Sequence, residues 1–201
     1  MAKAKTYHKE DLRRDLLSAA RSYVAENGYM SLSLRALAQQ VNVSTAAPYH
    51  HFSDRRALLL AIAIEGFEDL IGRARTVSDS DESAEEKLVA MAEAFLDFAG
   101  AQPRLLELMY ESELTTPEPD PSLRTYQDEG YAGLLSVMAK ARQDLPQDHL
   151  SFRVMALWST IYGYAMLRNK LMLEPFEPTS ATRREVDRAI VLQAVKAALL
   201  D

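Results

Sequence analysis

The feature that most constrains the fold is the spacing of apolar residues in segment 33–52, SLRALAQQVNVSTAAPYHHF. Leu34, Leu37 and Val41 recur at helical intervals and form one apolar stripe. Ser33 stands directly before the stripe, where its hydroxyl can cap a helix. The pattern predicts a short amphipathic helix that begins after Ser33.

A second short helix is predicted after a tight turn. Asn42 stands where the chain must turn, and Asn tolerates the left-handed backbone conformation better than most residues. Ser44 can cap the next helix, which we expect over residues 45–51. Pro48 falls in its first turn, where at most one backbone hydrogen bond is lost.

Two short helices joined by a tight turn are typical of a helix-turn-helix, whose second helix lies in the DNA major groove. We expect Val43 to fill the turn, and the rings of Tyr49 and Phe52 to pack back on the first helix of the unit. The alternative is an ordinary helical hairpin of an all-α protein.

The flanking segments extend this unit to a three-helix head. Residues 10–27 place Leu12, Leu16, Ala20 and Val24 on one face of an amphipathic helix, which Gly28 can end with a positive φ. After the hairpin, Ser53 is expected to cap a long connecting helix over residues 54–75.

The rest of the chain reads as helices with few breaks and without strand-like alternation. Capping boxes at Ser83/Glu86 and Thr182/Glu185 open two of these helices. The expected helices are 83–100, 103–114, 122–142, 148–173 and 182–200. The predicted fold is all-α with about nine helices: a three-helix head with the helix-turn-helix, 1–53, and a helical bundle, 54–201.

Composition limits the partners. The 201 residues include no cysteine and no long uncharged apolar run, so we expect no disulfide and no membrane span, which fits a reducing cytoplasm. The net charge is −6, but the first 60 residues carry nine basic and five acidic side chains. This excess of positive charge lies beside the hairpin, where phosphates would be met. The tail residues Lys3, Lys5 and Lys9 either reach the minor groove or form a disordered, nonspecific arm.

The segment NGYMSLSLRALAQQVNVSTAAPYHHFSDRRALLLAI resembles the DNA-binding head of the tetracycline-repressor (TetR) family. Asn42 replaces the usual turn glycine, and Arg55 replaces a lysine. PRLLELMY and LWSTIYG resemble more weakly the branch with a Trp-His-Gly-type ligand-binding domain, although Trp158 is followed by Tyr162 and Gly163 without the histidine.

The resemblance implies a ligand-responsive transcriptional regulator, with a DNA-binding domain over residues 1–53 and a ligand-binding and dimerisation domain over residues 54–201. Such a protein, most often a repressor, binds a palindromic double-stranded DNA operator as a homodimer and is released by a small molecule. It implies no cofactor. A ligand that favours a tilted connecting helix would shift the population toward dimers whose heads are wrongly spaced.

Side-chain chemistry sorts the candidate DNA contacts. Hydroxyl, imidazole and guanidinium groups at helix starts suit phosphates, and the exposed side of the second helix suits bases. The phosphate candidates are Ser33, Thr45, Tyr49, His51 and Arg55, and the base-reading candidates are Thr45, Ala46, Ala47 and His50. Ser44 completes the set, and Arg35 either touches a groove edge or lies in solvent. We expect thymine methyl contacts, with His50 as the main polar reader.

The last two long predicted helices indicate how two copies of the chain could associate. Helix 148–173 is apolar on two sides, and the alanines of the last helix permit close helix approach. The two stripes are Val154, Trp158, Ile161 and Ala165, and Met155, Tyr162, Met166 and Asn169; the alanines are Ala189, Ala194, Ala197 and Ala198. A four-helix interface between two copies satisfies these faces, and packing within one chain is the alternative.

Aromatic and methionine side chains on the middle helices are the candidates for a mostly apolar effector pocket. They are Phe67, Met91, Phe95, Met109, Tyr110, Tyr131, Trp158 and Tyr162. The alternative is that these residues only fill a core.

Catalytic signatures are missing from the sequence. The four histidines form no metal-binding spacing, and no phosphate-binding loop or nucleophile elbow occurs. We therefore expect no enzyme, no catalytic residue and no metal site. A helical protein-interaction module that keeps the hairpin as a scaffold remains the second alternative, and salt-sensitive duplex binding would separate the two.

Overall fold

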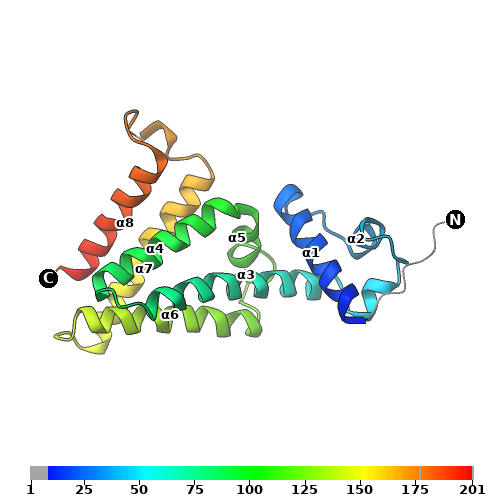
Figure 1. The fold of residues 1–201 in the computed structure, drawn as a ribbon, viewed down its shortest axis with the longest axis horizontal. Coiled ribbons are helices and arrows are strands. Elements are labelled where there is room, and N and C mark those ends of the chain that lie inside the picture. The colour runs from blue at the N-terminus through cyan, green and yellow to red at the C-terminus, as the bar shows by residue number, and fades with distance from the viewer. Residues whose placement is uncertain (1–8, 177, 201) are drawn as a thin grey trace. The chain divides into compact units, whose positions relative to one another are not determined.

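The computed structural model describes residues 9–176 and 178–200, and this part of the chain contains helices and no strands (Figure 1). The elements are α1 (Lys9–Asn27), α2 (Leu34–Gln40), η1 (Ala47–His50), α3 (Arg55–Ser78), α4 (Ala84–Ala101), α5 (Pro103–Tyr110), α6 (Pro121–Ala141), α7 (Gln147–Asn169), η2 (Glu174–Phe176) and α8 (Arg183–Leu199). Here η marks a 3-10 helix. The expected all-α fold class is confirmed.

The described chain divides into two compact units. The first, here the head unit, takes the residues up to Glu68 together with Gln102–Arg124. The second, here the body unit, takes Asp69–Ala101 and the residues from Thr125 onward. Two helices, α3 and α6, contribute residues to both units. The domain boundary expected after residue 53 stays a prediction.

The head unit is built on the apolar face of α1. Leu16 and Ala20 are fully buried, as are Leu37 of α2 and Leu58 of α3, so the predicted stripe forms the core. Gly28 ends α1 with φ +77°, as expected. Helix α5 also packs in this unit, against α1.

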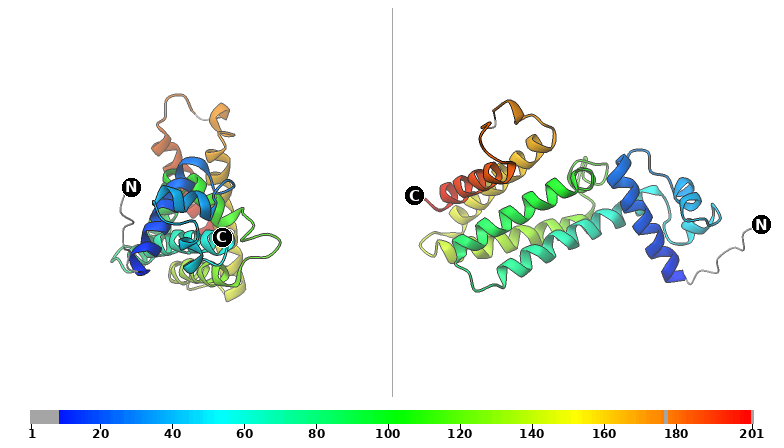
Figure 2. Two further views of the ribbon diagram at one scale, coloured as in Figure 1. Left: turned by 90° about the vertical axis from the view of Figure 1, so that its right-hand side faces the viewer. Right: turned by 45° about the horizontal axis from the view of Figure 1, so that its top comes forward.

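The body unit has α4, α7 and α8 packed against one another (Figure 2). Its core contains Phe98 of α4, Val154 and Ile161 of α7, and Val191 and Val195 of α8. Burial of these side chains is the main favourable term that holds the three helices together.

Both predicted capping boxes are confirmed in the body unit. The Ser83 hydroxyl accepts a hydrogen bond from the Glu86 amide at 3.2 Å, and the Glu86 carboxylate accepts one from the Ser83 amide at 2.9 Å. Thr182 and Glu185 make the same pair of bonds at the start of α8. The Ser83 hydroxyl also donates to the Glu86 carboxylate at 2.7 Å, and this bond is the main cause that lowers the pKa of Glu86. The Thr182 amide, followed by the Thr182 hydroxyl, lowers the pKa of Glu185, because these donors stabilise the ionised carboxylate.

Three predicted helix boundaries are wrong. Asp54, and not Ser53, caps α3, because its carboxylate accepts the Ala57 amide at 2.8 Å. Helix α5 ends at Tyr110 instead of residue 114; Ser112 just beyond it bonds the Leu108 carbonyl and the Leu114 amide. Helix α7 ends at Asn169 instead of residue 173, since Leu171 adopts a left-handed conformation with φ +58°.

Candidate nucleic-acid interface

The first half of the hairpin forms as expected. The Ser33 hydroxyl accepts the Ala36 amide at 3.2 Å and so caps α2. Asn42 takes φ +59°, which confirms the left-handed turn. The Val43 amide donates to the Ala38 carbonyl at 2.9 Å and closes the turn, and the Val43 side chain is half-buried.

The second half differs from the α-helix expected over residues 45–51. Only Ala47–His50 is helical, and as a 3-10 helix, η1, whose N-cap is Ala46 without a side-chain cap. The expected cap by the Ser44 hydroxyl is therefore wrong; the Ser44 carbonyl accepts the Ala47 amide instead. Pro48 lacks an N–H, and the bonds of the short segment, Tyr49 to Ala46 and His51 to Pro48, span three residues. The Phe52 amide, beyond η1, reaches four residues back to the Pro48 carbonyl.

The side chains of η1 and the turn before it face solvent. Thr45, Ala46, Tyr49 and His50 are exposed, whereas Ala47 and His51 are half-buried. Tyr49 is 51% exposed, so it is only partly covered, and the expectation that its ring packs on the first helix of the unit stays a prediction. These exposed side chains form a short, mixed apolar and polar face that is free to contact another molecule.

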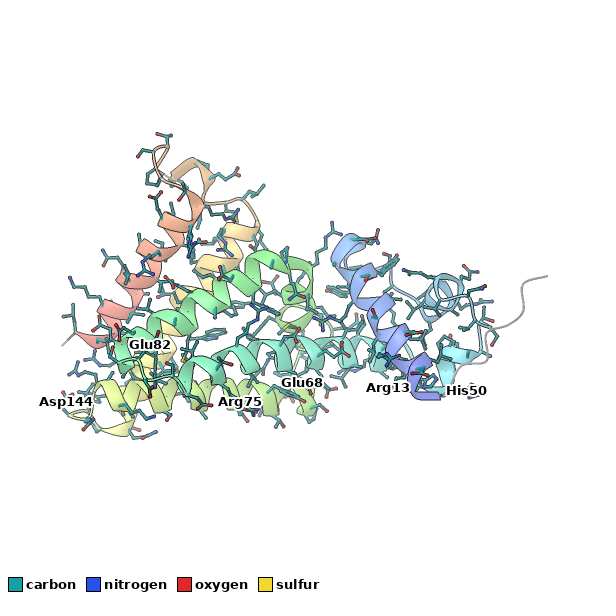
Figure 3. The ribbon with its side chains drawn as sticks, in the orientation of Figure 1. Arg13, His50, Glu68, Arg75, Glu82 and Asp144 are labelled. Carbon is teal, nitrogen blue, oxygen red and sulfur yellow. The ribbon has the colours of Figure 1, made fainter. Side chains whose placement is uncertain are left out.

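Phe52 packs as predicted, and its ring contacts a basic residue, Arg13, that the sequence analysis did not identify. Its ring is 3% exposed, and the guanidinium carbon of Arg13 in α1 lies over the ring, 5.5 Å from the centroid. Figure 3 labels Arg13 and His50, which lie at the same end of the head unit. The sequence signal that could have identified Arg13 was its place as a basic residue on the exposed side of the predicted helix 10–27.

Arg55, a predicted phosphate contact, uses its donors inside the head unit. Its Nε atom donates to the Leu32 carbonyl at 2.9 Å, and Nη2 donates to the Tyr29 and Met30 carbonyls at 2.8 and 3.1 Å. Its Nη1 atom pairs with the Glu113 carboxylate. The guanidinium thus ties the chain that enters α2 to the start of α3.

The remaining DNA-contact candidates are exposed at the same hairpin. Ser33 and Arg35 lie at the start of α2, and Ser44 lies in the turn before η1. Tyr29, just before the hairpin, is buried. Burial raises the pKa of the Tyr29 phenol, and the nearby carboxylates of Glu107 and Glu113 shift it in the same direction.

The effector candidates fall into two groups. In the head unit, the rings of Phe67 and Tyr110 lie 5.2 Å apart, and Met109 is buried. A Cβ atom on Gly66 would come within 2.6 Å of the Met109 sulfur, so α3 and α5 pack closely there. A role for these three side chains in effector binding stays a prediction.

The second group lies in the body unit. Phe95 packs edge-on against Trp158 with ring centroids 4.7 Å apart, and Tyr162 lies 5.9 Å from Trp158. Met91 is buried and Tyr131 is exposed. In this ring cluster Phe95 is buried and the other two residues are half-buried, and a role in ligand binding also stays a prediction.

A groove of about 650 Å³ runs between α7 and α8 in the body unit. Small and apolar side chains line much of it, among them Phe152, Ala156, Ala194 and Ala197. Phe152 is 63% exposed, so a large aromatic side chain stands open to solvent here. None of the predicted effector residues is in the lining of this groove.

Two further observations concern metal sites and membrane-spanning helices. Across residues 9–176 and 178–200, no cluster of three or more histidine and carboxylate side chains is arranged to hold a metal ion. In the same ranges, every helix is too short or too polar to cross a membrane.

Comparison with known proteins identifies the family. The model described as "Bacterial regulatory proteins, tetR family" matches residues 16–62, which contain the hairpin. The model described as "Tetracyclin repressor-like, C-terminal domain" matches residues 88–191, just over half of the chain. The chain belongs to the TetR family. The resemblance seen in the hairpin is thus confirmed, whereas the Trp-His-Gly branch stays a prediction.

Solved structures share the fold of this TetR-family chain. A Rhodococcus sp. RHA1 protein of unknown function is 31% identical, covers 98% of this chain and 97% of its own, and has a TM-score of 0.79. The regulator BioQ, solved with its double-stranded DNA operator, has a TM-score of 0.65 at 20% identity, over 96% of this chain and 99% of its own.

Curated TetR-type relatives match over shorter stretches. The transcriptional activator FasR of Mycolicibacterium smegmatis is 27% identical over 108 residues, 54% of this chain and 49% of FasR. The transcriptional repressor Rv1474c of Mycobacterium tuberculosis is 40% identical over 68 residues, 34% of this chain and 36% of the relative. The chain thus spans half or less of these relatives, which are regulators of opposite sign.

Proposed function

We propose that this TetR-family chain is a ligand-responsive transcriptional repressor that binds a palindromic operator as a homodimer and is released by a small molecule. The observation that carries the proposal is the exposed face of η1 and its preceding turn, on a hairpin that matches the family's DNA-binding model. Thr45, Ala46, Tyr49 and His50 project from it into solvent.

The chemistry of this face suits the major groove. Ala46 and the Thr45 methyl group are apolar and can contact thymine methyl groups, and His50 offers a donor or an acceptor to a base edge. The Tyr49 hydroxyl can reach a phosphate. One copy presents only this short face, so specificity requires two half-sites, about 34 Å apart for two symmetric heads.

The proposed dimer surface is the groove between α7 and α8. Phe152 and Ala156 on α7 and Ala197 on α8 are exposed, and a second copy that brings the same two helices would cover them in a four-helix interface. Apolar side chains that remain exposed in one copy would then be buried, which is the main driving force for association.

The proposed effector-binding side chains form two groups, each a separate candidate: Phe67, Met109 and Tyr110 in the head unit, and Met91, Phe95, Tyr131, Trp158 and Tyr162 in the body unit. Helix α3 provides the route to the DNA, because it begins two residues after Ser53 and supplies residues to both units. An effector that binds better when α3 is tilted would favour dimers that do not fit the operator.

The test is duplex binding at several salt concentrations, followed by a footprint on the promoter of the chain's own gene. A regulator should bind duplex DNA with an affinity that falls steeply as salt rises, and should protect a two-fold symmetric site. A purified, folded sample that ignores duplex DNA at low salt would overturn the proposal and favour the protein-interaction module.

A further inference from the structure

The exposed η1 face accounts for the proposed base contacts, but it does not show which guanidinium of the head unit binds the DNA backbone. Phosphate contacts set the register of a DNA-binding helix, and arginine is well suited to them because its planar fork matches two phosphate oxygens. Arg55 stands near the hairpin, but the Leu32, Tyr29 and Met30 carbonyls take its donors.

Arg13 is placed differently. It projects from the exposed side of α1, and its guanidinium lies over the ring of Phe52, 5.5 Å from the centroid. Phe52 follows η1 after a single residue, and its amide donates to the Pro48 carbonyl at 3.0 Å. The buried ring thus anchors Arg13 beside the C-terminal end of the exposed η1 face.

The contact with Phe52 leaves most donors of the Arg13 guanidinium available. An aromatic ring attracts the cation electrostatically and is only a weak hydrogen-bond acceptor, so it does not satisfy the five N–H donors of the guanidinium. The aromatic contact therefore restrains the side chain, so that less conformational entropy is lost when the edge binds a ligand.

The charges around Arg13 support a role outside the protein. Among the side chains that the structure describes, which begin at Asp11, no carboxylate forms an ion pair with Arg13, whereas the adjacent Arg14 bonds Asp11 at 3.1 Å. The two arginines are exposed neighbours on one helix, but only Arg13 combines a ring contact that restrains it with the absence of a carboxylate partner among the described side chains.

We infer that Arg13 is a phosphate-binding residue of the DNA interface, held in place by Phe52. This inference rests on the proposed function, since it presumes that η1 enters a groove. Arg13 stands beyond the C-terminal end of η1 and not on its exposed face, so the sugar-phosphate backbone bordering the groove lies within its reach. Its contribution is positioning and salt-dependent affinity, and not base discrimination.

The experiment uses the full chain and a duplex of about 30 base pairs of arbitrary sequence, titrated by fluorescence anisotropy over a range of KCl concentrations. Arg13→Gln should weaken binding about three- to tenfold and reduce the slope of log K against log salt by about one for each phosphate that the variant no longer neutralises. Arg14→Gln is the matched control, with a smaller change in both quantities.

A second variant separates charge from geometry. Arg13→Lys keeps the charge but loses the planar fork, so it should preserve the salt slope within error and still bind more weakly than the wild type. Circular dichroism checks that each variant is folded.

A measurement on the wild type keeps the inference testable if Arg13→Gln misfolds. Phenylglyoxal modifies accessible arginines, and mass spectrometry should show that the duplex protects Arg13 but not Arg14. Equal modification of Arg13 with and without DNA, or an Arg13→Gln titration that matches Arg14→Gln, would overturn the inference. If the wild type itself bound no duplex, the proposed function would fail, which is a distinct result.

Discussion

The buried guanidinium of Arg168 in α7 lies 2.8 Å from the carboxylate of Asp187 in α8, and this pair connects three helices of the body unit. Its second terminal nitrogen donates to the Leu96 carbonyl of α4 at 2.7 Å, and the Tyr164 hydroxyl donates to Asp187 at 2.6 Å. Gly100 makes room for it, since a Cβ atom there would lie 3.0 Å from the guanidinium.

The first prediction is that Arg168→Met destabilises the protein by about 2 to 3 kcal/mol in urea unfolding. The change leaves the Asp187 carboxylate and the Leu96 carbonyl without their charged donor. The loss stays below that of a fully enclosed pair because Asp187 keeps the Tyr164 bond and is partly exposed. Arg188→Met is the control: Arg188 pairs with Glu93 at the surface and should cost less than about 1 kcal/mol.

We expect Arg55 to contribute mainly to the stability of the head unit and not to a phosphate contact. Arg55→Gln removes the donors of the Leu32, Tyr29 and Met30 carbonyls, so the free energy of unfolding should fall by about 1 to 3 kcal/mol. Hydrogen exchange of the segment before α2 should rise. Arg35→Gln, at an exposed position in α2, should leave both unchanged. An Arg55→Gln protein of wild-type stability that binds duplex DNA poorly would instead support the phosphate role.

Asn42 gives a test of the backbone in the hairpin turn. At φ +59° a β-carbon is strained, and Asn tolerates this conformation better than alanine does. Asn42→Ala should lower the free energy of unfolding by about 1 kcal/mol, whereas Asn42→Gly should be neutral or slightly stabilising. Thermal unfolding of the two variants side by side provides the measurement. A less stable glycine variant would show that the Asn42 side chain itself matters.

His50 is expected to be the polar base reader. His50→Ala should reduce discrimination between the operator found by footprinting and single-base variants of it, by about 1 to 3 kcal/mol at one position in each half-site. Anisotropy titrations at constant salt measure this. His149→Ala, in α7, should leave discrimination unchanged. A uniform loss of affinity over all duplexes would assign His50 to the DNA backbone.

The groove between α7 and α8 is expected to be covered in the dimer. Phe152→Glu places a charge on a side chain that the second copy would bury, so the variant should run as a monomer in size-exclusion chromatography with light scattering. Phe176→Glu is the control, because Phe176 is 82% exposed and lies outside the groove lining. Dimers of both variants would place the interface elsewhere.

Local signals were enough to predict most of the fold. The caps at Ser33, Ser83 and Thr182 each depend on atoms within three residues along the chain, and all three form. The predicted ends of helices were less accurate. The turn at Leu171 is one example, because no glycine or asparagine marks it.

The candidate DNA-contact site was predicted from the sequence less accurately than the fold. The hairpin and its exposed side chains follow from spacing, but the α-helix expected over residues 45–51 is a single 3-10 turn. Pro48 stands in the first turn of η1 and has no N–H, and the segment is too short to continue into an α-helix.

By itself, the sequence determined most of the α-helices, the caps at Ser33, Ser83 and Thr182, the left-handed turn at Asn42 and the family, because each depends on residues close together in the chain. Only the tertiary structure decided which arginine bonds to groups inside the protein and which has its N–H groups available for another molecule. Arg55 and Glu113 are 58 residues apart in the chain and pair in space, whereas Arg13 lies over Phe52. A long cationic side chain can reach many partners, so only the folded arrangement selects one.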